Sequence, residues 1–175
     1  MLRLWLLRHA KSAWDDPDLD DFSRPLAPRG KKACRRLGRH MAERGIRPDL
    51  ALCSPAARTR QTWERVAKRL PPDITCRFDP GLYLAERKAL QALVRSAPAE
   101  CRELMLIGHN PGLEDLAAQL CGGGAGDALE RLIAKYPTGA LAEISFAAKR
   151  WAEVTPKSGY LASFVTPSML EAEDD

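Results

Sequence analysis

Three short apolar runs are the feature that most constrains how this chain can fold. They cover residues 1–7, 50–53 and 103–107, and each is followed by polar residues and then by a segment with helical spacing. Strands buried on both faces give short continuous apolar runs, and their alternation with helices is typical of a parallel sheet covered on each side. The sequence therefore predicts a three-layer α/β/α sandwich with a mostly parallel central sheet.

The predicted helices lie between and after these strands. Ala33, Leu37 and Met41 form one apolar stripe of a helix that ends near residue 45. Ser54 and Pro55 have the residue types preferred at the N-cap and first position of a helix, which we expect to run through residue 70. Two further helices are predicted over residues 86–96 and 113–120, the second broken by the glycines at 122–124.

The C-terminal third adds strands of a different kind. Residues 75–78 are a weaker strand candidate, whereas residues 140–146 and 151–154 have the pattern of a hairpin closed by residues 148–150. A hairpin at this place predicts that one strand runs antiparallel to its neighbours. No internal repeat is visible.

The chain is long enough for one domain with its own core, because 175 residues can bury most of their extended surface. We expect a single domain over residues 1–167 and an acidic C-terminal tail over residues 168–175. Without the four tail carboxylates the net charge of +4 becomes +8, so the body of the protein is basic and suits an anionic ligand. The tail carboxylates are Glu171, Glu173, Asp174 and Asp175.

Several classes of protein are disfavoured by what the sequence lacks. The five cysteines are odd in number and widely spaced, without a Cys-x-x-Cys pair, which favours neither a zinc site nor a disulfide framework. No run approaches the roughly 18 apolar residues of a membrane span, and residues 2–7 are too short for a signal peptide. No helix-turn-helix, zinc-finger or RNA-binding motif accompanies the basic residues. We expect a cytoplasmic protein that binds neither membrane nor nucleic acid.

Two histidines directly follow predicted strands. Arg8 and His9 come after the first strand, and His109 lies in the Gly-His-Asn-Pro-Gly segment after residues 103–107. Ligand sites in parallel sheets form beyond the carboxyl ends of the strands, so these side chains are expected to meet there. Arg58 is predicted in the first turn of a helix, where its guanidinium and free backbone N–H groups can bind phosphate together.

These segments resemble the histidine phosphatase superfamily. The similarity rests on Leu-Leu-Arg-His at residues 6–9, Ser-Pro-x-x-Arg-Thr-x-Gln-Thr at 54–62 and Gly-His-Asn-Pro at 108–111. Asp-Phe-Ser-Arg-Pro-Leu at 21–26 and Tyr-Pro-Thr-Gly-Ala at 136–140 are similar to the small phosphohistidine phosphatases of the SixA type. The resemblance covers nearly the whole chain and implies a phosphoglycerate mutase-like fold.

The resemblance also implies roles for individual residues. It makes His9 the nucleophile that takes the phosphoryl group, with Arg8, Arg58 and His109 around the phosphoryl oxygens and no metal or cofactor. A neutral imidazole, with an ordinary pKa of about 6.5, can attack phosphorus while the neighbouring cations stabilise the oxygens. We expect those cations to lower the pKa of His9, and a hydrogen bond from its Nδ1–H to fix the tautomer. The predicted substrate-binding residues are Ser12, Arg24 and Asn110.

Two positions depart from the family pattern, and the general acid has no clear counterpart. Ala10 stands where the superfamily usually has glycine, and Asp15 stands where mutase relatives usually have a phosphate-binding asparagine. A carboxylate there would repel phosphate, so Asp15 is either turned away or protonated during turnover. The candidates for the acid are Asp15, Asp20, Asp21 and Glu86.

The sequence thus predicts a metal-independent hydrolase that works through a phosphohistidine on His9. The favoured substrate is phosphohistidine in a protein, because the glutamate segment of mutase-like members is missing. Two alternatives stay open: an enzyme that acts on small phosphorylated molecules, as a phosphomonoesterase or mutase, and a protein that binds a phosphorylated ligand without turning it over. The sequence does not identify the oligomeric state.

Overall fold

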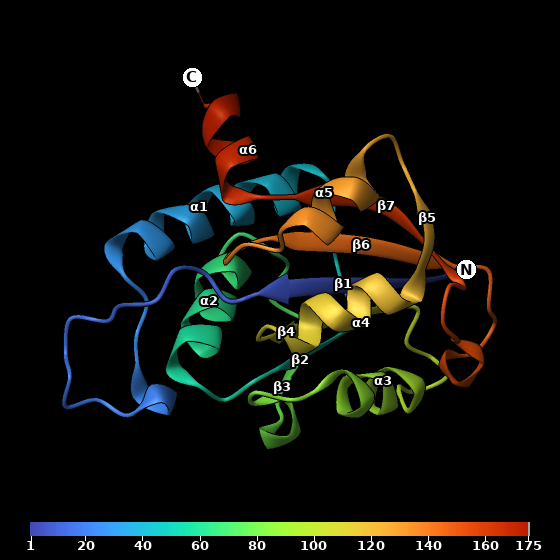
Figure 1. Ribbon diagram of the computed structural model, residues 1–175, viewed down its shortest axis with the longest axis horizontal. Coiled ribbons are helices and arrows are strands. Elements are labelled where there is room, and N and C mark those ends of the chain that lie inside the picture. The colour runs from blue at the N-terminus through green and yellow to red at the C-terminus, as the bar shows by residue number, and fades with distance from the viewer. Residues whose placement is uncertain (175) are drawn as a thin grey trace.

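A seven-stranded mixed sheet forms the centre of the protein, in a computed structural model that describes residues 1–174 (Figure 1). Its strands are β1 (Leu2–Arg8), β2 (Leu50–Cys53), β3 (Thr75–Phe78), β4 (Glu103–Gly108), β5 (Cys121–Gly124), β6 (Leu141–Phe146) and β7 (Gly159–Val165). The helices are α1 (Pro28–Glu43), α2 (Ala57–Ala67), α3 (Arg87–Arg95), α4 (Gly112–Leu120), α5 (Ala128–Ala134) and α6 (Pro167–Glu173). Three short 3-10 helices are η1 (Asp21–Ser23), η2 (Pro80–Leu82) and η3 (Trp151–Glu153).

The strands are arranged in the order β3-β2-β4-β1-β6-β7-β5. β3, β2, β4 and β1 pair in parallel, β6 is antiparallel to both β1 and β7, and β5 pairs in parallel with β7. Only β6 therefore runs against the common direction of the strands. The predicted α/β fold with a mostly parallel sheet is confirmed.

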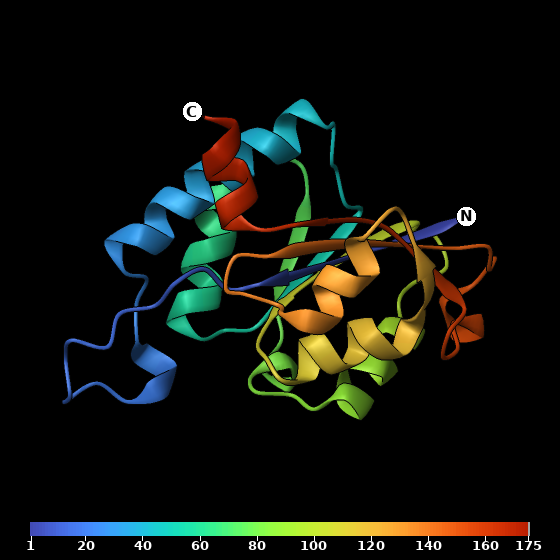
Figure 2. The ribbon, with the colours of Figure 1, turned by 45° about the horizontal axis from the view of Figure 1, so that its top comes forward.

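Each face of the sheet is covered by its own apolar core. Leu4 and Leu6 of β1 belong to the cluster under α3, α4 and α5, whereas Trp5 and Leu7 belong to the cluster under α1, α2 and α6. Successive side chains of a strand point to opposite faces, which explains why a continuous apolar run is needed here. The two helical layers are visible on either side of the sheet when the molecule is turned (Figure 2).

The predicted C-terminal hairpin has the correct first strand and the wrong second strand. β6 covers the first of the two segments, but residues 151–153 form η3, and the strand that pairs with β6 is β7. Trp151 is buried, and its indole Nε1 donates a hydrogen bond of 2.6 Å to the carbonyl of Cys101. Trp151 therefore packs against the core from a 3-10 helix and does not pair in a strand.

The glycines at residues 122–124 end α4 as expected, but they also form the edge strand β5, which the sequence did not indicate. A Cβ atom at Gly122 would lie 2.2 Å from the carbonyl oxygen of Lys157. Only glycine allows two backbones to approach this closely, so Gly122 lets β5 pack against the backbone at Lys157.

The predicted start of α2 is also corrected. The helix begins at Ala57, and Ala56 is its N-cap without a side-chain hydrogen bond. Ser54 and Pro55 form an extended link between β2 and α2, so Ser54 is available for a contact elsewhere. Arg58 is in the first turn, as expected.

The boundary expected between residues 167 and 168 falls inside α6, which packs on α1 (Figure 2). Leu170 is buried, and the carboxylate of Asp174 pairs with Arg36 at 2.8 Å and Arg39 at 3.2 Å. Asp175 lies outside the described residues. Over residues 1–174, the helices are too short or too polar to cross a membrane.

Gly30 fixes the distance between α1 and the segment that follows β1, which gives a test of this packing. A Cβ atom at Gly30 would lie 2.1 Å from the carbonyl oxygen of Lys11. We expect Gly30→Ala to lower the free energy of unfolding by about 1–3 kcal/mol, since backbone must move to relieve the overlap.

Urea unfolding of purified variants measures this change. Gly123→Ala is the matched control, because its Cβ would meet Tyr160 at an ordinary 3.8 Å. The control is expected to stay within about 1 kcal/mol of the parent. An equal effect of the two substitutions would contradict the close approach at Gly30.

Candidate active site

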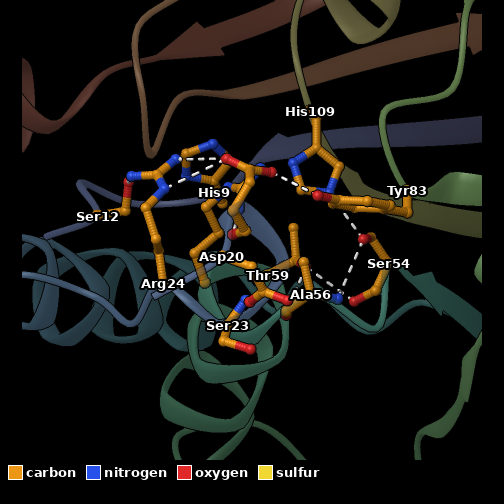
Figure 3. Close-up of polar contacts among 12 residues, drawn as sticks. His9, Ser12, Asp20, Ser23, Arg24, Ser54, Ala56, Thr59, Tyr83 and His109 are labelled. Atoms are coloured by element: carbon orange, nitrogen blue, oxygen red, sulfur yellow. Dashed lines mark hydrogen bonds and ion pairs between the residues drawn. The ribbon is translucent and has the colours of Figure 1, made fainter. Parts of the chain in front are cut away.

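The parallel pairing of β1 with β4 brings the two predicted histidines together. Arg8 is in register with Gly108, and the backbone N–H of His9 donates to the carbonyl of Gly108 at 3.1 Å. The imidazole rings of His9 and His109 consequently lie 5.5 Å apart between their centroids (Figure 3). β2, on the other side of β4, ends at the same edge of the sheet and delivers Ser54.

His9 is arranged as a neutral imidazole with a free lone pair. Its side chain is buried, and Nδ1 lies 2.8 Å from the carbonyl oxygen of Ala10. A carbonyl can only accept, so Nδ1 carries the hydrogen and Nε2 is left unprotonated. Burial, together with the positive charges of Arg58, Arg8 and Arg24, lowers the pKa of His9 to about 4, although the hydrogen bond to Ala10 opposes this. The expected tautomer and direction of the shift are both present.

His109 is neutral as well. Burial and the charge of Arg58 lower its pKa to about 3. Its Nε2 shares a hydrogen bond of 2.7 Å with the Ser54 hydroxyl. The positive charge of the site therefore comes from the arginines and not from this histidine.

Arg58 is buried at the centre of the site. Its guanidinium donates to the backbone carbonyl of Asp21 at 2.7 Å and to the Asp21 carboxylate at 3.0 Å. Arg24 is also buried and donates to the other carboxylate oxygen of Asp21 at 3.1 Å and to the Ser12 hydroxyl at 2.9 Å. The carboxylate of Asp21 thus binds two arginines, one near it in the chain and one in α2.

Asp21 and Tyr83 complete the arrangement around Arg58. Partial burial raises the pKa of Asp21, but hydrogen bonds from Tyr83, Arg58 and Arg24 outweigh it and lower that pKa to about 2. The Tyr83 hydroxyl donates to Asp21 at 2.5 Å, and its ring lies edge-on to His109 at 5.5 Å between centroids. Asp21 is therefore a carboxylate at neutral pH.

Arg8 directly precedes His9 and donates to the carbonyl of Tyr136 at 2.9 Å. The same carbonyl accepts from the Asn110 amide at 3.0 Å, and Asn110 also contacts Glu114 at the start of α4. The amide of Asn110 thus bonds to protein partners. Burial lowers the pKa of Arg8, and the charge of Glu114 opposes this.

Three buried nitrogens of the site have no hydrogen-bond partner among the described residues. Within residues 1–174, the Nε atoms of Arg8 and Arg58 and the Nδ1 atom of His109 are buried without a hydrogen-bond partner. Buried polar atoms are nearly always paired, and exceptions call for an explanation such as an absent ligand. Arg8 lies at the end of β1, His109 directly follows β4, and Arg58 is in the first turn of α2. Unpaired nitrogens at this edge of the sheet suit an anionic ligand.

Of the four candidates for a general acid, only Asp21 is bonded to residues of the site. Asp20 is exposed, and its carboxylate accepts from the backbone of Ser23 at the start of η1 (Figure 3). Asp15 and Glu86 are exposed, the second at the start of α3. The position of Asp15 agrees with a carboxylate turned toward solvent.

Three contributors were not singled out from the sequence. Tyr83 follows η2 without any motif, Tyr136 donates its hydroxyl to the carbonyl of Leu6 at 2.5 Å, and Thr62 accepts from the backbone N–H of Ala10 at 3.0 Å. The segments that contain Tyr136 and Thr62 did indicate a family resemblance, whereas nothing near Tyr83 distinguished it. Within residues 1–174, His, Cys, Asp and Glu side chains form no group of three that could hold a metal ion.

Fold and site together define an α/β protein with two neutral histidines and clustered arginines at the carboxyl edge of its sheet. The model of the histidine phosphatase superfamily (branch 1) matches residues 4–88. An uncharacterised protein of Mycobacterium tuberculosis is 32% identical over 163 residues, which cover 92% of this chain and 99% of that protein. The chain belongs to the histidine phosphatase superfamily, whose members are phosphatases or mutases.

Solved structures extend the comparison. The "putative phosphohistidine phosphatase SixA" of Agrobacterium tumefaciens is 32% identical, with a TM-score of 0.78 over 95% of this chain and 98% of that one. A second protein with that description, from Nakamurella multipartitia, is 26% identical, with a TM-score of 0.80 over 95% and 96% of the two chains. A structure of the protein histidine phosphatase SixA with tungstate shares the fold at 21% identity, with a TM-score of 0.75 over 97% and 99%.

The lowered pKa values of the two histidines predict how stability changes with pH. Each histidine binds a proton in the unfolded chain below its ordinary pKa of about 6.5, but stays neutral in the folded protein until about pH 4 or 3. The unfolded state thus binds more protons, and stability falls as pH falls through this range. We expect each histidine to cost the folded state about 1 kcal/mol between pH 7 and pH 5.5.

Urea unfolding at the two pH values measures the effect in the parent and in His9→Gln/His109→Gln. The double variant should lose about 2 kcal/mol less than the parent over this interval. Equal losses would show that the two histidines are not held neutral. His40→Gln controls for a histidine outside the site.

Proposed function

We propose that this protein is a phosphatase for phosphohistidine in proteins and that it works through a phosphohistidine intermediate on His9. The observation that supports this most is the state of the site itself. His9 offers an unprotonated Nε2 beside clustered arginines, while the one candidate acid bonded to the site, Asp21, is ionised. This combination suits a leaving group that departs without a proton from the enzyme.

In the first step, the Nε2 lone pair of His9 forms a bond to phosphorus as the bond from phosphorus to the leaving group breaks. No proton has to leave His9, because its Nδ1–H is retained in the hydrogen bond to Ala10. The ring gains positive charge in this step, and the Ala10 carbonyl stabilises it. In the second step, water attacks the phosphoryl group, phosphate leaves, and His9 returns as the neutral ring.

In this proposal, the arginines supply the positive charge that stabilises the phosphoryl oxygens. Arg8 and Arg58 each have an unpartnered buried Nε, and a phosphoryl group bound beside His9 would satisfy both. Fixed positive groups around the equatorial oxygens stabilise a transition state in which charge spreads over them. His109 is neutral and contributes its unpartnered Nδ1 as a hydrogen-bonding group.

The ionised Asp21 supports the choice of leaving group. An alkoxide needs a proton in the transition state, and a carboxyl with a pKa of about 2 is a poor donor at neutral pH. An imidazole, with a pKa of about 6.5, leaves as a neutral ring once solvent has protonated it. Phosphohistidine is therefore the phosphorylated amino acid that fits this site best.

The surroundings of the site support a protein substrate. Trp14 is 71% exposed and stacks 3.4 Å from the Arg24 guanidinium, and Phe22 is 40% exposed and packs on Tyr83. Leu19 and Leu84 are exposed in the same two segments. Exposed aromatic residues beside arginine are enriched in protein interfaces. The five unpaired cysteines support a reducing compartment such as the cytoplasm.

The first functional test removes the proposed nucleophile and one arginine. His9→Ala is expected to abolish hydrolysis of an aryl phosphate while the circular dichroism spectrum stays unchanged. Arg58→Ala should slow the reaction by roughly one to two decades, because a charge-assisted hydrogen bond to phosphate is lost.

Steady-state kinetics measure both effects, with His40→Ala as the control because His40 lies on α1 outside the site. Trapping the reaction in acid-free detergent should show a phosphorylated parent chain and no label on His9→Ala. Turnover by His9→Ala at the parent's rate would remove His9 from the mechanism.

The second functional test compares substrates. We expect kcat/KM for a phosphohistidine peptide to exceed that for phosphoserine peptides and sugar phosphates by at least about two decades, or ~2.7 kcal/mol. One enzyme preparation is assayed with all three by phosphate release. Equal or faster hydrolysis of a sugar phosphate would assign the enzyme to small phosphorylated molecules.

A further inference from the structure

A basic groove of about 1,070 Å³ lies beside the site, between α1 and the segment that joins α5 to β6, and the start of α6 closes one side. We call it the α1–α6 groove. Among the described residues, Glu171 is the one carboxylate that lines it. Its cationic residues besides Arg8 are Lys11, Arg29, Lys32, Arg36, Arg131 and Lys135.

The groove adjoins the proposed phosphoryl site. Arg8 lines the groove, and its charge also contributes to the lowered pKa of His9. Pro137 and Thr138 form part of the wall, and the next residue, Gly139, donates its backbone N–H to the carbonyl of His9 at 2.9 Å. A chain whose phosphoryl group sits at His9 can thus continue into the groove.

The start of α1 places positive charge where a helix least tolerates it. Arg29 and Lys32 lie in the first turns of α1, which has no acidic residue in its first turn and no side-chain cap at Ala27. The N-terminal end of a helix is itself partly positive, so cations there destabilise the helix. A bound anion would offset this cost, which makes the charges more useful for binding than for folding.

Some cations of the groove already have an ion-pair partner in the protein, and others do not. Arg36 pairs with Asp174 at 2.8 Å, and Arg131 pairs with Asp127 at 3.0 Å. Among the described residues, Lys11, Arg29 and Lys32 have no ion-pair partner, and neither does Lys135. These four unpaired cations are available to an anionic ligand, and one of them, Lys11, is two residues from His9 in the chain.

The protein's own C-terminal segment indicates which anion fits α1. Asp174, which follows α6, binds Arg36 and Arg39 of α1 with its carboxylate oxygens. A carboxylate is therefore already seated on this helix, and Arg36 is one to two turns from Lys32 and Arg29. The same chemistry can continue along the helix toward its N-terminus.

The walls between the cations are apolar. Pro28, Ala134, Phe164, Pro167 and Met169 all line the groove. A bare phosphate chain has no group that benefits from such surface, whereas the methylene groups and apolar side chains of a peptide do. The mixture of cations and apolar walls favours a peptide with carboxylate side chains.

We propose that the α1–α6 groove binds an acidic segment of the substrate protein, next to the phosphohistidine that reacts with His9. The inference that an acidic peptide binds here depends only on the groove. The inference that this peptide lies next to a phosphohistidine rests on the proposed function. Positive charge in the groove would raise the association rate of acidic substrates. It would also favour phosphoproteins that have acidic residues around the phosphorylated histidine.

The first experiment measures binding without catalysis. Fluorescence anisotropy follows a labelled glutamate-rich peptide that carries no phosphate, with the full chain and with Arg29→Glu/Lys32→Glu/Lys135→Glu. We expect affinity to fall at least about tenfold in this groove variant and to weaken with added salt. All three side chains are exposed, so the fold should tolerate the changes.

The matched control reverses one arginine and two lysines elsewhere, in Arg87→Glu/Lys88→Glu/Lys149→Glu, all exposed and outside the groove. It changes net charge equally and is expected to bind within about twofold of the parent. Equal losses in the two triple variants would reduce the effect to net charge and overturn the proposal. Tighter binding of inorganic tripolyphosphate than of the peptide would overturn it in favour of a phosphate chain.

The second experiment adds catalysis. Phosphohistidine peptides with glutamate neighbours should have a KM at least about tenfold lower than peptides with serine neighbours, and the groove variant should remove that advantage. Hydrolysis of an aryl phosphate should stay unchanged in the groove variant. Loss of aryl phosphate hydrolysis as well would place these residues in the reaction and contradict a docking role.

The two proposals fail in different ways. If no phosphohistidine peptide is hydrolysed while the glutamate-rich peptide still binds the parent and not the groove variant, the proposed function fails and the groove stands. If phosphohistidine peptides are hydrolysed without regard to their neighbours, the proposed function stands and the groove proposal is wrong.

Discussion

The parallel pairing of β1 with β4 is the interaction on which the rest of the site depends. Arg8 and Gly108 are the last paired residues of the two strands, and each is followed directly by a histidine. The hydrogen bond from the His9 backbone N–H to the Gly108 carbonyl closes the pairing at this end. A shift of one residue would turn every side chain of β1 to the other face, which would exchange the two apolar cores. The apolar run at the N-terminus therefore fixes the register, and the register fixes the distance between the two histidines.

The site is held together by charges that would repel each other in isolation. Arg24 and Arg58 are both buried near His9, and Asp21 supplies the opposite charge with its carboxylate and its backbone carbonyl. Burial, together with the positive charges of these arginines, keeps His9 and His109 neutral. The structure thus combines clustered positive charge with an unprotonated histidine, which water-exposed groups could not do together.

The sequence predicted the parts of the fold that depend on local pattern and missed those that depend on distant contacts. β2 was predicted to the residue because it is a short apolar run between two helical segments, and the bounds of the weaker candidate β3 were also correct. β5 was missed because its glycines are explained only by the backbone of Lys157, which lies far along the chain. Residues 151–153 were assigned to a strand because the pattern cannot show that Trp151 packs inward.

The same division applies to the site. The positions of His9, His109 and Arg58 follow from strand ends and a helix start, which are local features. The contact between Asp21 and Arg58 joins residues 37 positions apart, and that between Tyr83 and Asp21 joins residues 62 apart. No spacing in the sequence indicates such contacts, so the role of Asp21 as a partner of the arginines became visible only in the fold.

That partnership makes Asp21 an internal counterion. In the proposed reaction, a phosphoryl group would meet an Arg58 that already pairs with a carboxylate, so its binding would exchange one anion for another. Such an exchange would lower the affinity for a small anion such as free phosphate. A larger substrate would add contacts outside the exchange, so the same arrangement would favour binding of the substrate and release of phosphate.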